Sequence, residues 1–224
     1  MKINYCLPII KKNKEEIFKI IETNISDYQY FEVWLDYVEN LDEAFITKLT
    51  NLLENHLIVL FRRLNLEPII MDVQHRLDII SLVSTSESFL DLDITQKEEL
   101  EYVQKNAIKI NIIISYHDYH ETPSDQKLKD ILAEMKKYNP TIYKIATICV
   151  SEDDAIKLLQ LQGILKKENK RHIVLGMGKF GTITRVFGAL WGNEMIFAPE
   201  TIEDQSAPGQ LTKMQLENIF KQLQ

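Results

Sequence analysis

Two residues of this sequence combine types and positions that suit covalent catalysis. Lys144 lies inside the apolar run IYKIATIC, residues 142–149, which has the composition of a β-strand. Period two puts Lys144, Ala146 and Ile148 on one face of that strand. Burial in such apolar surroundings lowers the pKa of a lysine and frees its amine to form a Schiff base. The alternative is a lysine near a strand end whose side chain extends to water.

His117 follows the apolar run INIIISY, residues 110–116, within the segment SYHDYHETP. A histidine titrates near neutrality and moves protons in both directions when a neighbour fixes its tautomer, so His117 is a candidate general base. Two other interpretations stay open. His117, Asp118 and His120 have the types of metal ligands, although no further His or Cys stands at ligand spacing. The HD pair also suits a loop cap before a helix that begins at TP.

Other polar groups stand near the ends of apolar runs. Arg62 ends the run LIVLFR, and Arg185 follows GMGKFG by one helical turn, so each guanidinium suits a carboxylate or hydroxyl groups. Asp91 and Asp93 share one strand face, and we expect them to support neighbouring groups rather than to react. The loop SAPGQ, residues 206–210, offers a hydroxyl and an amide before the last helix.

Apolar, β-branched runs predict the strands that carry these side chains, at residues 3–9, 30–36, 57–62, 89–94, 110–116, 142–149, 172–177 and 194–199. Segments of helical period lie between them, for example at residues 11–24, 41–56, 124–138 and 152–169. This alternation predicts βαβ units and a parallel sheet. We expect an α/β fold in which residues 1–224 form a single (β/α)8 TIM barrel, with an open doubly wound sheet as the alternative. In such a barrel, chemistry belongs at the carboxyl ends of the strands.

The segment GMGKFG, residues 176–181, has the G-x-G-x-x-G spacing of a dinucleotide-binding turn. Such a turn also requires an acidic residue about 20 positions on, at the end of the next strand. Glu200 is only roughly placed for that role. We therefore do not expect this chain to bind a nucleotide.

Composition argues against several classes of protein. A formal net charge of -7 disfavours general binding of nucleic acids, which depends on clustered Lys and Arg. Cys6 and Cys149 form neither a CxxC pair nor a disulfide framework, which indicates a reducing compartment, and we expect the cytoplasm. The apolar stretch at the amino terminus is too short for a signal peptide, and no run approaches the ~20 apolar residues of a membrane span. We expect neither a nucleic-acid partner nor a membrane partner.

The segments SYHDYHETP, IYKIA, MGKFGTITR and SAPGQ, in that order, resemble the motifs of the type I 3-dehydroquinate dehydratase family. EVWLD, LFRR and FLDLDI resemble further motifs of that family, so the resemblance covers most of the chain. It implies a (β/α)8 barrel, usually a homodimer, that dehydrates 3-dehydroquinate to 3-dehydroshikimate. This reaction belongs to the shikimate pathway of aromatic amino acid biosynthesis. The resemblance implies neither a metal nor an organic cofactor.

The resemblance also implies a role for each matched residue. Lys144 forms an imine with the substrate ketone, and the protonated imine is the electron sink. His117 removes a proton from the adjacent carbon, assists loss of the hydroxyl as water, and passes protons during imine formation and hydrolysis. Glu32 and Arg62 hold ring hydroxyls of the substrate.

At the other end of the substrate, the resemblance implies that Arg185, Ser206 and Gln210 hold the carboxylate. The last two lie on a loop that closes over the substrate and excludes water. The glycine turn then belongs to the family's M-G-x-x-G-x-x-S/T-R motif, residues 177–185, and Gly176 completes the dinucleotide pattern by accident.

The chain departs from the family pattern at several positions. Trp34 stands where many members carry a second substrate-binding arginine, and Tyr119 replaces a phenylalanine. The usual Glu-Gly-Gly after the third strand is missing from RLNLEPIIM, residues 63–71. The amino-terminal hairpin that closes the barrel bottom in longer members is expected to be absent.

Two other functions stay open at this point. A non-catalytic relative that binds a hydroxylated carboxylate or a partner protein is suggested by Trp34. A class I aldolase would use the same lysine chemistry on a sugar phosphate, but no phosphate-cradling glycine loop is evident beyond the turn already described.

Overall fold

The computed structural model of this protein describes residues 3–61 and 71–223. Its strands are β1 (Tyr5–Ile9), β2 (Tyr30–Trp34), β3 (Leu57–Leu60), β4 (Phe89–Asp93), β5 (Asn111–Asp118), β6 (Ile142–Ile148), β7 (His172–Met177) and β8 (Ile196–Phe197). Its α-helices are α1 (Lys14–Asn24), α2 (Glu43–Leu53), α3 (Val73–Val83), α4 (Lys97–Lys105), α5 (Asp125–Lys136), α6 (Glu152–Lys167), α7 (Gly178–Trp191) and α8 (Lys213–Gln222). Two short 3-10 helices are η1 (Leu35–Tyr37) and η2 (Glu54–His56).

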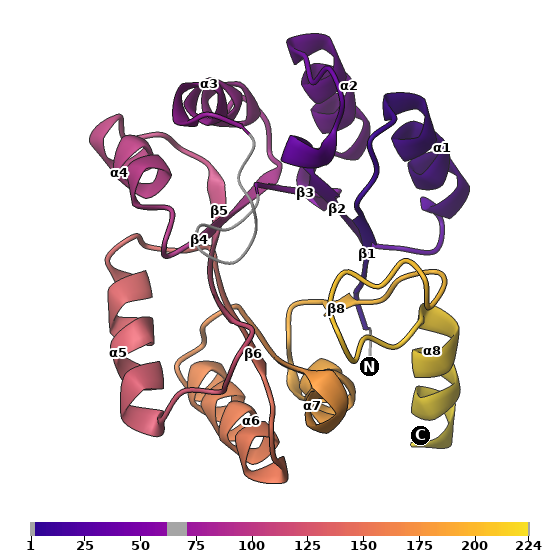
Figure 1. The fold of residues 1–224 in the computed structure, drawn as a ribbon, viewed down its shortest axis with the longest axis vertical. Helices are drawn as coiled ribbons and strands as arrows, with labels where there is room; N and C mark the ends of the chain where they lie inside the picture. The colour runs from indigo at the N-terminus through magenta and orange to yellow at the C-terminus, as the bar shows by residue number, and fades with distance from the viewer. Residues whose placement is uncertain (1–2, 62–70, 224) are drawn as a thin grey trace.

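The strands form one parallel sheet in the order β7-β6-β5-β4-β3-β2-β1-β8. The helices surround this sheet as an outer ring (Figure 1). A backbone hydrogen bond of 2.8 Å from Glu194 to His172 connects the segment before β8 to the start of β7, so the barrel is nearly closed. The predicted barrel is therefore confirmed. The doubly wound alternative is wrong, because neighbouring strands follow chain order without the reversal that such a sheet requires.

Each predicted run contains a strand, and the differences lie at the strand ends. Strand β5 continues to Asp118, because it pairs with β6 as far as Asp118 opposite Thr147. His117 therefore lies within the strand rather than just after it. Strand β8 is shorter than predicted, because only Ile196 and Phe197 pair with β1.

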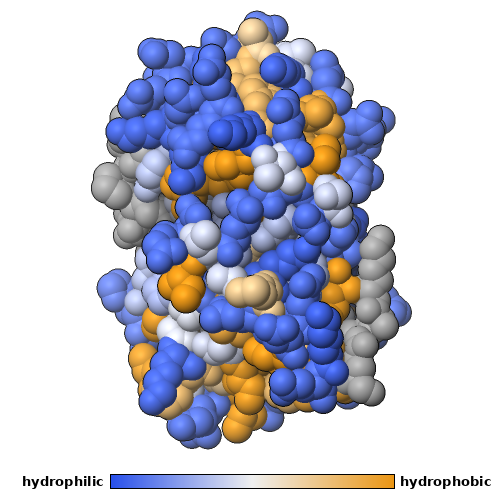
Figure 2. Space-filling model, turned by 90° about the vertical axis from the view of Figure 1, so that its right-hand side faces the viewer, coloured by the Kyte–Doolittle hydropathy of each residue, from blue (hydrophilic) through white to orange (hydrophobic). Residues whose placement is uncertain are grey.

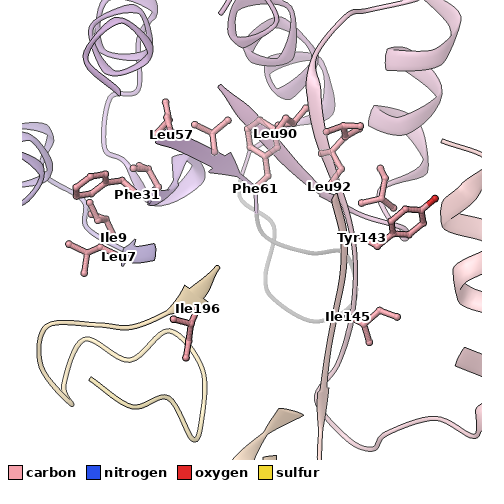
Figure 3. Packing of buried hydrophobic residues seen from close by; sticks show 14 of the residues in the cluster. Leu7, Ile9, Phe31, Leu57, Phe61, Leu90, Leu92, Tyr143, Ile145 and Ile196 are labelled. Atoms are coloured by element: carbon pink, nitrogen blue, oxygen red, sulfur yellow. The ribbon is translucent and has the colours of Figure 1, made fainter. Parts of the chain in front are cut away.

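Two groups of buried apolar side chains hold the barrel together. The larger group lies between strands and helices, and Figure 3 shows Phe31, Leu57 and Tyr143 pointing from the strands toward surrounding elements. The smaller group fills the barrel interior and includes Ile58 and Ile113. Each strand contributes apolar side chains to both groups, one group from each of its faces. This explains why the sequence shows continuous apolar runs.

Polar side chains at their amino termini fix where several helices begin. The Ser151 hydroxyl accepts a hydrogen bond from the backbone of Asp154, and the Asp154 carboxylate accepts one from the backbone of Ser151. Thr212 and Gln215 form the same reciprocal box. The face that carries α1 and α8 is mostly hydrophilic, with hydrophobic groups scattered across it (Figure 2). Among the described residues, no helix has the length and apolar character needed to cross a bilayer.

Candidate active site

The carboxyl-terminal halves of the strands surround a pocket with about 380 Å³ of space free of protein atoms, its open mouth included. The pocket is lined by Glu32, Trp34, His117, Tyr119, Lys144, Ala146, Leu175, Met177, Arg185, Phe197, Ser206, Ala207 and Gln210. Every site residue proposed from the sequence is among them except Arg62, which lies outside the described residues.

Lys144 is buried in the wall of this pocket, with 3% of its surface exposed. The interpretation of a lysine that extends to water is therefore wrong. Its Nζ donates hydrogen bonds to Asp91 Oδ2 at 2.6 Å and to Glu32 Oε2 at 3.1 Å, and it lies 4.5 Å from the centre of the Phe197 ring. The expectation of apolar surroundings is also wrong, because two carboxylates face the nitrogen. These belong to β2 and β4, so the pattern of β6 alone could not reveal them.

The two carboxylates of β4 contact different residues, one the lysine and the other the histidine. Asp91 contacts Lys144, whereas Asp93 Oδ2 lies 2.9 Å from His117 Nδ1. Both aspartates are buried, at 2% and 1% exposure. Because they are two residues apart on β4, both side chains point into the barrel, where each faces a different partner. The contacts agree with the expectation that these residues support neighbouring groups.

His117 stands on β5 with 8% of its surface exposed. An ionised carboxylate accepts hydrogen bonds and donates none, so the contact with Asp93 assigns the ring hydrogen to Nδ1. In that tautomer the other ring nitrogen, Nε2, carries no hydrogen. The Tyr119 ring packs edge-on against the imidazole, with centroids 6.5 Å apart.

The residues that follow His117 cap a loop and the helix after it. Asp118 Oδ1 accepts hydrogen bonds from the backbone of His120 at 2.9 Å and of Glu121 at 3.1 Å, so the loop-cap interpretation applies to Asp118. The following helix begins after Ser124, whose hydroxyl caps it. Within residues 3–61 and 71–223, no group of three or more His, Cys, Asp or Glu is arranged to hold a metal ion.

Glu32 is held between two donors. Its Oε2 accepts from Lys144, and its Oε1 accepts from the indole nitrogen of Trp34 at 3.2 Å. Trp34 is 5% exposed and packs edge-on against Tyr37, with ring centroids 5.7 Å apart. In the sequence, Trp34 stands out as a departure from the family pattern and as the residue that suggests a non-catalytic relative. Period two along β2 places Glu32 and Trp34 on one strand face, which is the signal that could have paired them.

Arg185 brings a buried positive charge to the pocket, with 2% of its surface exposed. Its Nη2 donates a long hydrogen bond of 3.4 Å to the carbonyl of Pro208. Its buried Nε makes no hydrogen bond with any described residue. Burial lowers the pKa of Arg185 to about 10. A guanidinium in this environment attracts an anion, because a carboxylate would supply the hydrogen bonds and the opposite charge that it lacks.

The loop after β8 carries Ser206 and Gln210 to the pocket. The backbone nitrogen of Ser206 donates to Gln210 Oε1 at 2.8 Å, and Gln210 Nε2 donates to Ser206 Oγ at 2.9 Å. The backbone of Gly178 donates to Pro208 at 3.0 Å, which holds the loop against the start of α7. The predicted pair therefore forms one hydrogen-bonded unit beside Arg185.

The glycine turn joins β7 to α7 and allows close packing. A Cβ on Gly176 would lie 2.6 Å from the sulfur of Cys149 and 2.7 Å from the Cα of Gly181. Gly176 is therefore required where α7 crosses β7, and the expectation that it completes a motif by accident misses this role. Thr184 reinforces the crossing, because its hydroxyl accepts from the backbone of Gly176 at 2.6 Å.

Comparison with known proteins agrees with this geometry. The family model for type I 3-dehydroquinase matches residues 5–224. A 3-dehydroquinate dehydratase of Coxiella burnetii is 28% identical over 231 residues, covering 96% of this chain and 91% of that protein. One from Methanocaldococcus jannaschii is 27% identical over 222 residues, covering 96% and 97%.

Solved structures show the same fold. The crystal structure of 3-dehydroquinate dehydratase from Geobacillus kaustophilus superposes with a TM-score of 0.85 at 21% identity and covers 100% of this chain and 91% of that chain. The match of the family model extends over both the lysine strand and the arginine helix of the pocket. On this ground the chain belongs to the type I 3-dehydroquinase family.

Proposed function

We propose that this protein dehydrates 3-dehydroquinate to 3-dehydroshikimate through a Schiff base on Lys144, as a step of the shikimate pathway. The observation that carries the proposal is the shared pocket of Lys144 and His117, each buried and each held by its own carboxylate of β4. Family membership supports the same reaction. The class I aldolase and the non-catalytic relative gain no comparable support.

The first step is attack of the Lys144 amine on the substrate ketone. The ammonium first gives a proton to one of the carboxylates beside it, and both Asp91 and Glu32 are within hydrogen-bond distance. Loss of water from the adduct then leaves a protonated imine. Burial excludes solvent, which protects the imine from early hydrolysis.

The second step is removal of a proton from the carbon next to the imine by His117. The electron pair of that C–H bond moves into the protonated imine, which becomes an enamine. When the electron pair of the enamine moves back toward the ring, it expels the ring hydroxyl. The hydroxyl takes a proton from His117 and leaves as water. Asp93 holds the imidazole in the tautomer that this exchange requires and stabilises the imidazolium. Hydrolysis of the imine then releases the enone product and the amine.

The substrate carboxylate would bind at Arg185, beside Ser206 and Gln210. The buried guanidinium supports this assignment, because its Nε lacks a partner among the described residues. Glu32 is proposed to contact ring hydroxyls in addition to Lys144. The proposed role of Arg62 stays a prediction, since that residue lies outside the described ones. A homodimer in the cytoplasm likewise stays a prediction.

The test combines turnover with trapping. Purified protein is mixed with 3-dehydroquinate, absorbance of the conjugated enone is followed, and borohydride is added to reduce the imine for peptide mass spectrometry. The expected result is product formation and an adduct on Lys144. His117→Gln should keep the adduct but lower turnover by about 10²- to 10⁴-fold. Lys157→Ala, which alters a more exposed lysine of α6, is the control and should keep both signals.

Three results would contradict the proposal. Binding of 3-dehydroquinate without turnover, unaffected by Lys144→Ala, would select the non-catalytic relative. Carbon–carbon cleavage of a sugar phosphate would select the aldolase. An adduct on a lysine other than Lys144 would remove the assigned nucleophile.

A further inference from the structure

We propose that Trp34 is a positioning residue for imine formation: its indole N–H holds the carboxylate of Glu32 against Lys144, so that Glu32 receives the ammonium proton. This inference rests on the function proposed above and adds to it the residue that prepares the nucleophile. It also gives a function to one of the positions at which this chain departs from the family pattern.

The contacts around Glu32 carry the inference. The two carboxylate oxygens accept from different elements, Oε1 from Trp34 at 3.2 Å and Oε2 from Lys144 at 3.1 Å. Both residues that hold the carboxylate are buried, Trp34 at 5% and Lys144 at 3% exposure. The indole is itself fixed by its edge-on contact with Tyr37. A carboxylate held from both sides keeps one rotamer, so Oε2 stays aimed at the nitrogen.

The chemistry of the donor matters as much as its position. An indole N–H donates one hydrogen bond and carries no charge, so it orients the carboxylate without adding a positive charge beside it. An arginine in the same place would add a full positive charge and make Glu32 a weaker proton acceptor. Trp34 therefore fixes the geometry of Glu32 and leaves it able to take a proton from Lys144.

The proton transfer balances over the imine step. The N–H bond of the ammonium breaks, its proton bonds to Glu32 Oε2, and the nitrogen keeps the electron pair. That pair attacks the ketone carbon. The former carbonyl oxygen takes up two protons, one from the nitrogen of the adduct and the one held by Glu32, and leaves as water. The nitrogen ends as a protonated imine, and Glu32 returns to its ionised form.

The experiment replaces one N–H group without changing the ring. The chain has two tryptophans, Trp34 and Trp191, and Trp191 is 47% exposed on α7. In a Trp191→Phe background, Trp34 is therefore the only site for tryptophan analogues. Benzothienylalanine replaces the N–H with sulfur, whereas 5-fluorotryptophan keeps the N–H and is the matched control. Trp34→Phe is a second variant that needs no analogue.

Loss of the N–H is expected to lower kcat about tenfold, because one hydrogen bond to a charged group contributes about that much. KM should stay within about twofold of the parent value. The 5-fluorotryptophan protein should keep the parent kcat. Equal kcat for the two analogue proteins would overturn the inference. A change confined to KM would also overturn it, because Trp34 would then be only a wall of the substrate pocket.

A second readout does not depend on dehydration. Formaldehyde with cyanoborohydride converts reactive amines to methylamines through an imine, and peptide mass spectrometry gives the rate at Lys144 relative to exposed Lys105. The benzothienylalanine protein should label Lys144 several-fold more slowly than the 5-fluorotryptophan protein. Equal rates would overturn the role of Trp34 even if the parent protein failed to dehydrate 3-dehydroquinate. That last failure alone would instead remove the proposed function.

Discussion

Lys144 Nζ lies 2.6 Å from Asp91 Oδ2, a contact between residues 53 positions apart in the chain. The pair is buried from solvent, and Glu32 joins it from a third strand. The nucleophile of the proposed reaction is thus held inside a buried cluster of charges. Such a cluster affects both the stability of the folded protein and its chemistry.

Lys144→Met should lower the free energy of unfolding by about 3–5 kcal/mol, because the buried Glu32 and Asp91 lose the ammonium between them. Urea denaturation followed by circular dichroism measures the change. The triple variant Lys144→Met, Glu32→Gln, Asp91→Asn should recover most of the loss. Lys157→Met is the control, and it should cost at most about 1 kcal/mol, because the Lys157 side chain is 27% exposed and its partner Asp154 keeps hydrogen bonds from the backbone of Val150 and Ser151. Equal stability of Lys144→Met and the parent would contradict this account.

Arg185→Met should raise KM for 3-dehydroquinate about 10- to 100-fold, because it removes the charged hydrogen bonds proposed to hold the carboxylate. The free energy of unfolding of the empty protein should not fall, and a gain of about 1 kcal/mol is expected. The reason is that Arg185 is buried with its Nε unpaired among the described residues, and burial lowers its pKa to about 10. Steady-state kinetics and urea denaturation test the two parts.

Arg171→Met is the matched control for Arg185. Arg171 makes a two-point pair with Glu194, at 3.0 and 2.8 Å, outside the lining of the pocket. Its loss should leave KM unchanged. A KM that rose equally in both variants would show that the effect of Arg185 is not specific to the proposed carboxylate site.

Gly209→Ala should raise KM about tenfold, because it displaces the loop that carries Ser206 and Gln210. Gly209 has φ +80°, and a Cβ there would lie 2.6 Å from the carbonyl oxygen of Gly178. Its positive φ also favours glycine, so the free energy of unfolding should fall by about 1–3 kcal/mol. In contrast, Gly163→Ala meets no atom within 4 Å and should stabilise α6 by about 0.5–1 kcal/mol without changing KM. An unchanged KM in Gly209→Ala would contradict the role of the loop.

The protein should lose stability on mild acidification through His172. Burial lowers the pKa of His172 from its ordinary value of 6.5. The unfolded chain therefore binds a proton at a higher pH than the folded chain does, and the free energy of unfolding falls as the pH drops below 6.5. His172→Asn should reduce the difference in unfolding free energy between about pH 7.5 and about pH 5. His120→Gln, at an exposed position, should keep the parent difference.

Much of the fold and part of the site could be predicted from the sequence. Apolar runs of strand length predict the strands because the strands of a parallel barrel are buried on both faces. The sequence predicts Lys144 and His117 as a catalytic pair because its motifs follow one another in the same order as those of the family that it resembles. The alternation of FLDLDI placed Asp91 and Asp93 on one face, which is a local property of any strand.

The surroundings of each of these groups depend on the tertiary fold. The partners of Lys144 lie 53 and 112 positions away, and they meet it because the parallel strands close around a common interior. The pairing of Trp34 with Glu32 depends on the rotamers that this interior allows. Sequence patterns report which side of an element a residue occupies. The charge that it faces across the barrel is set by strand order and register, which no single segment encodes.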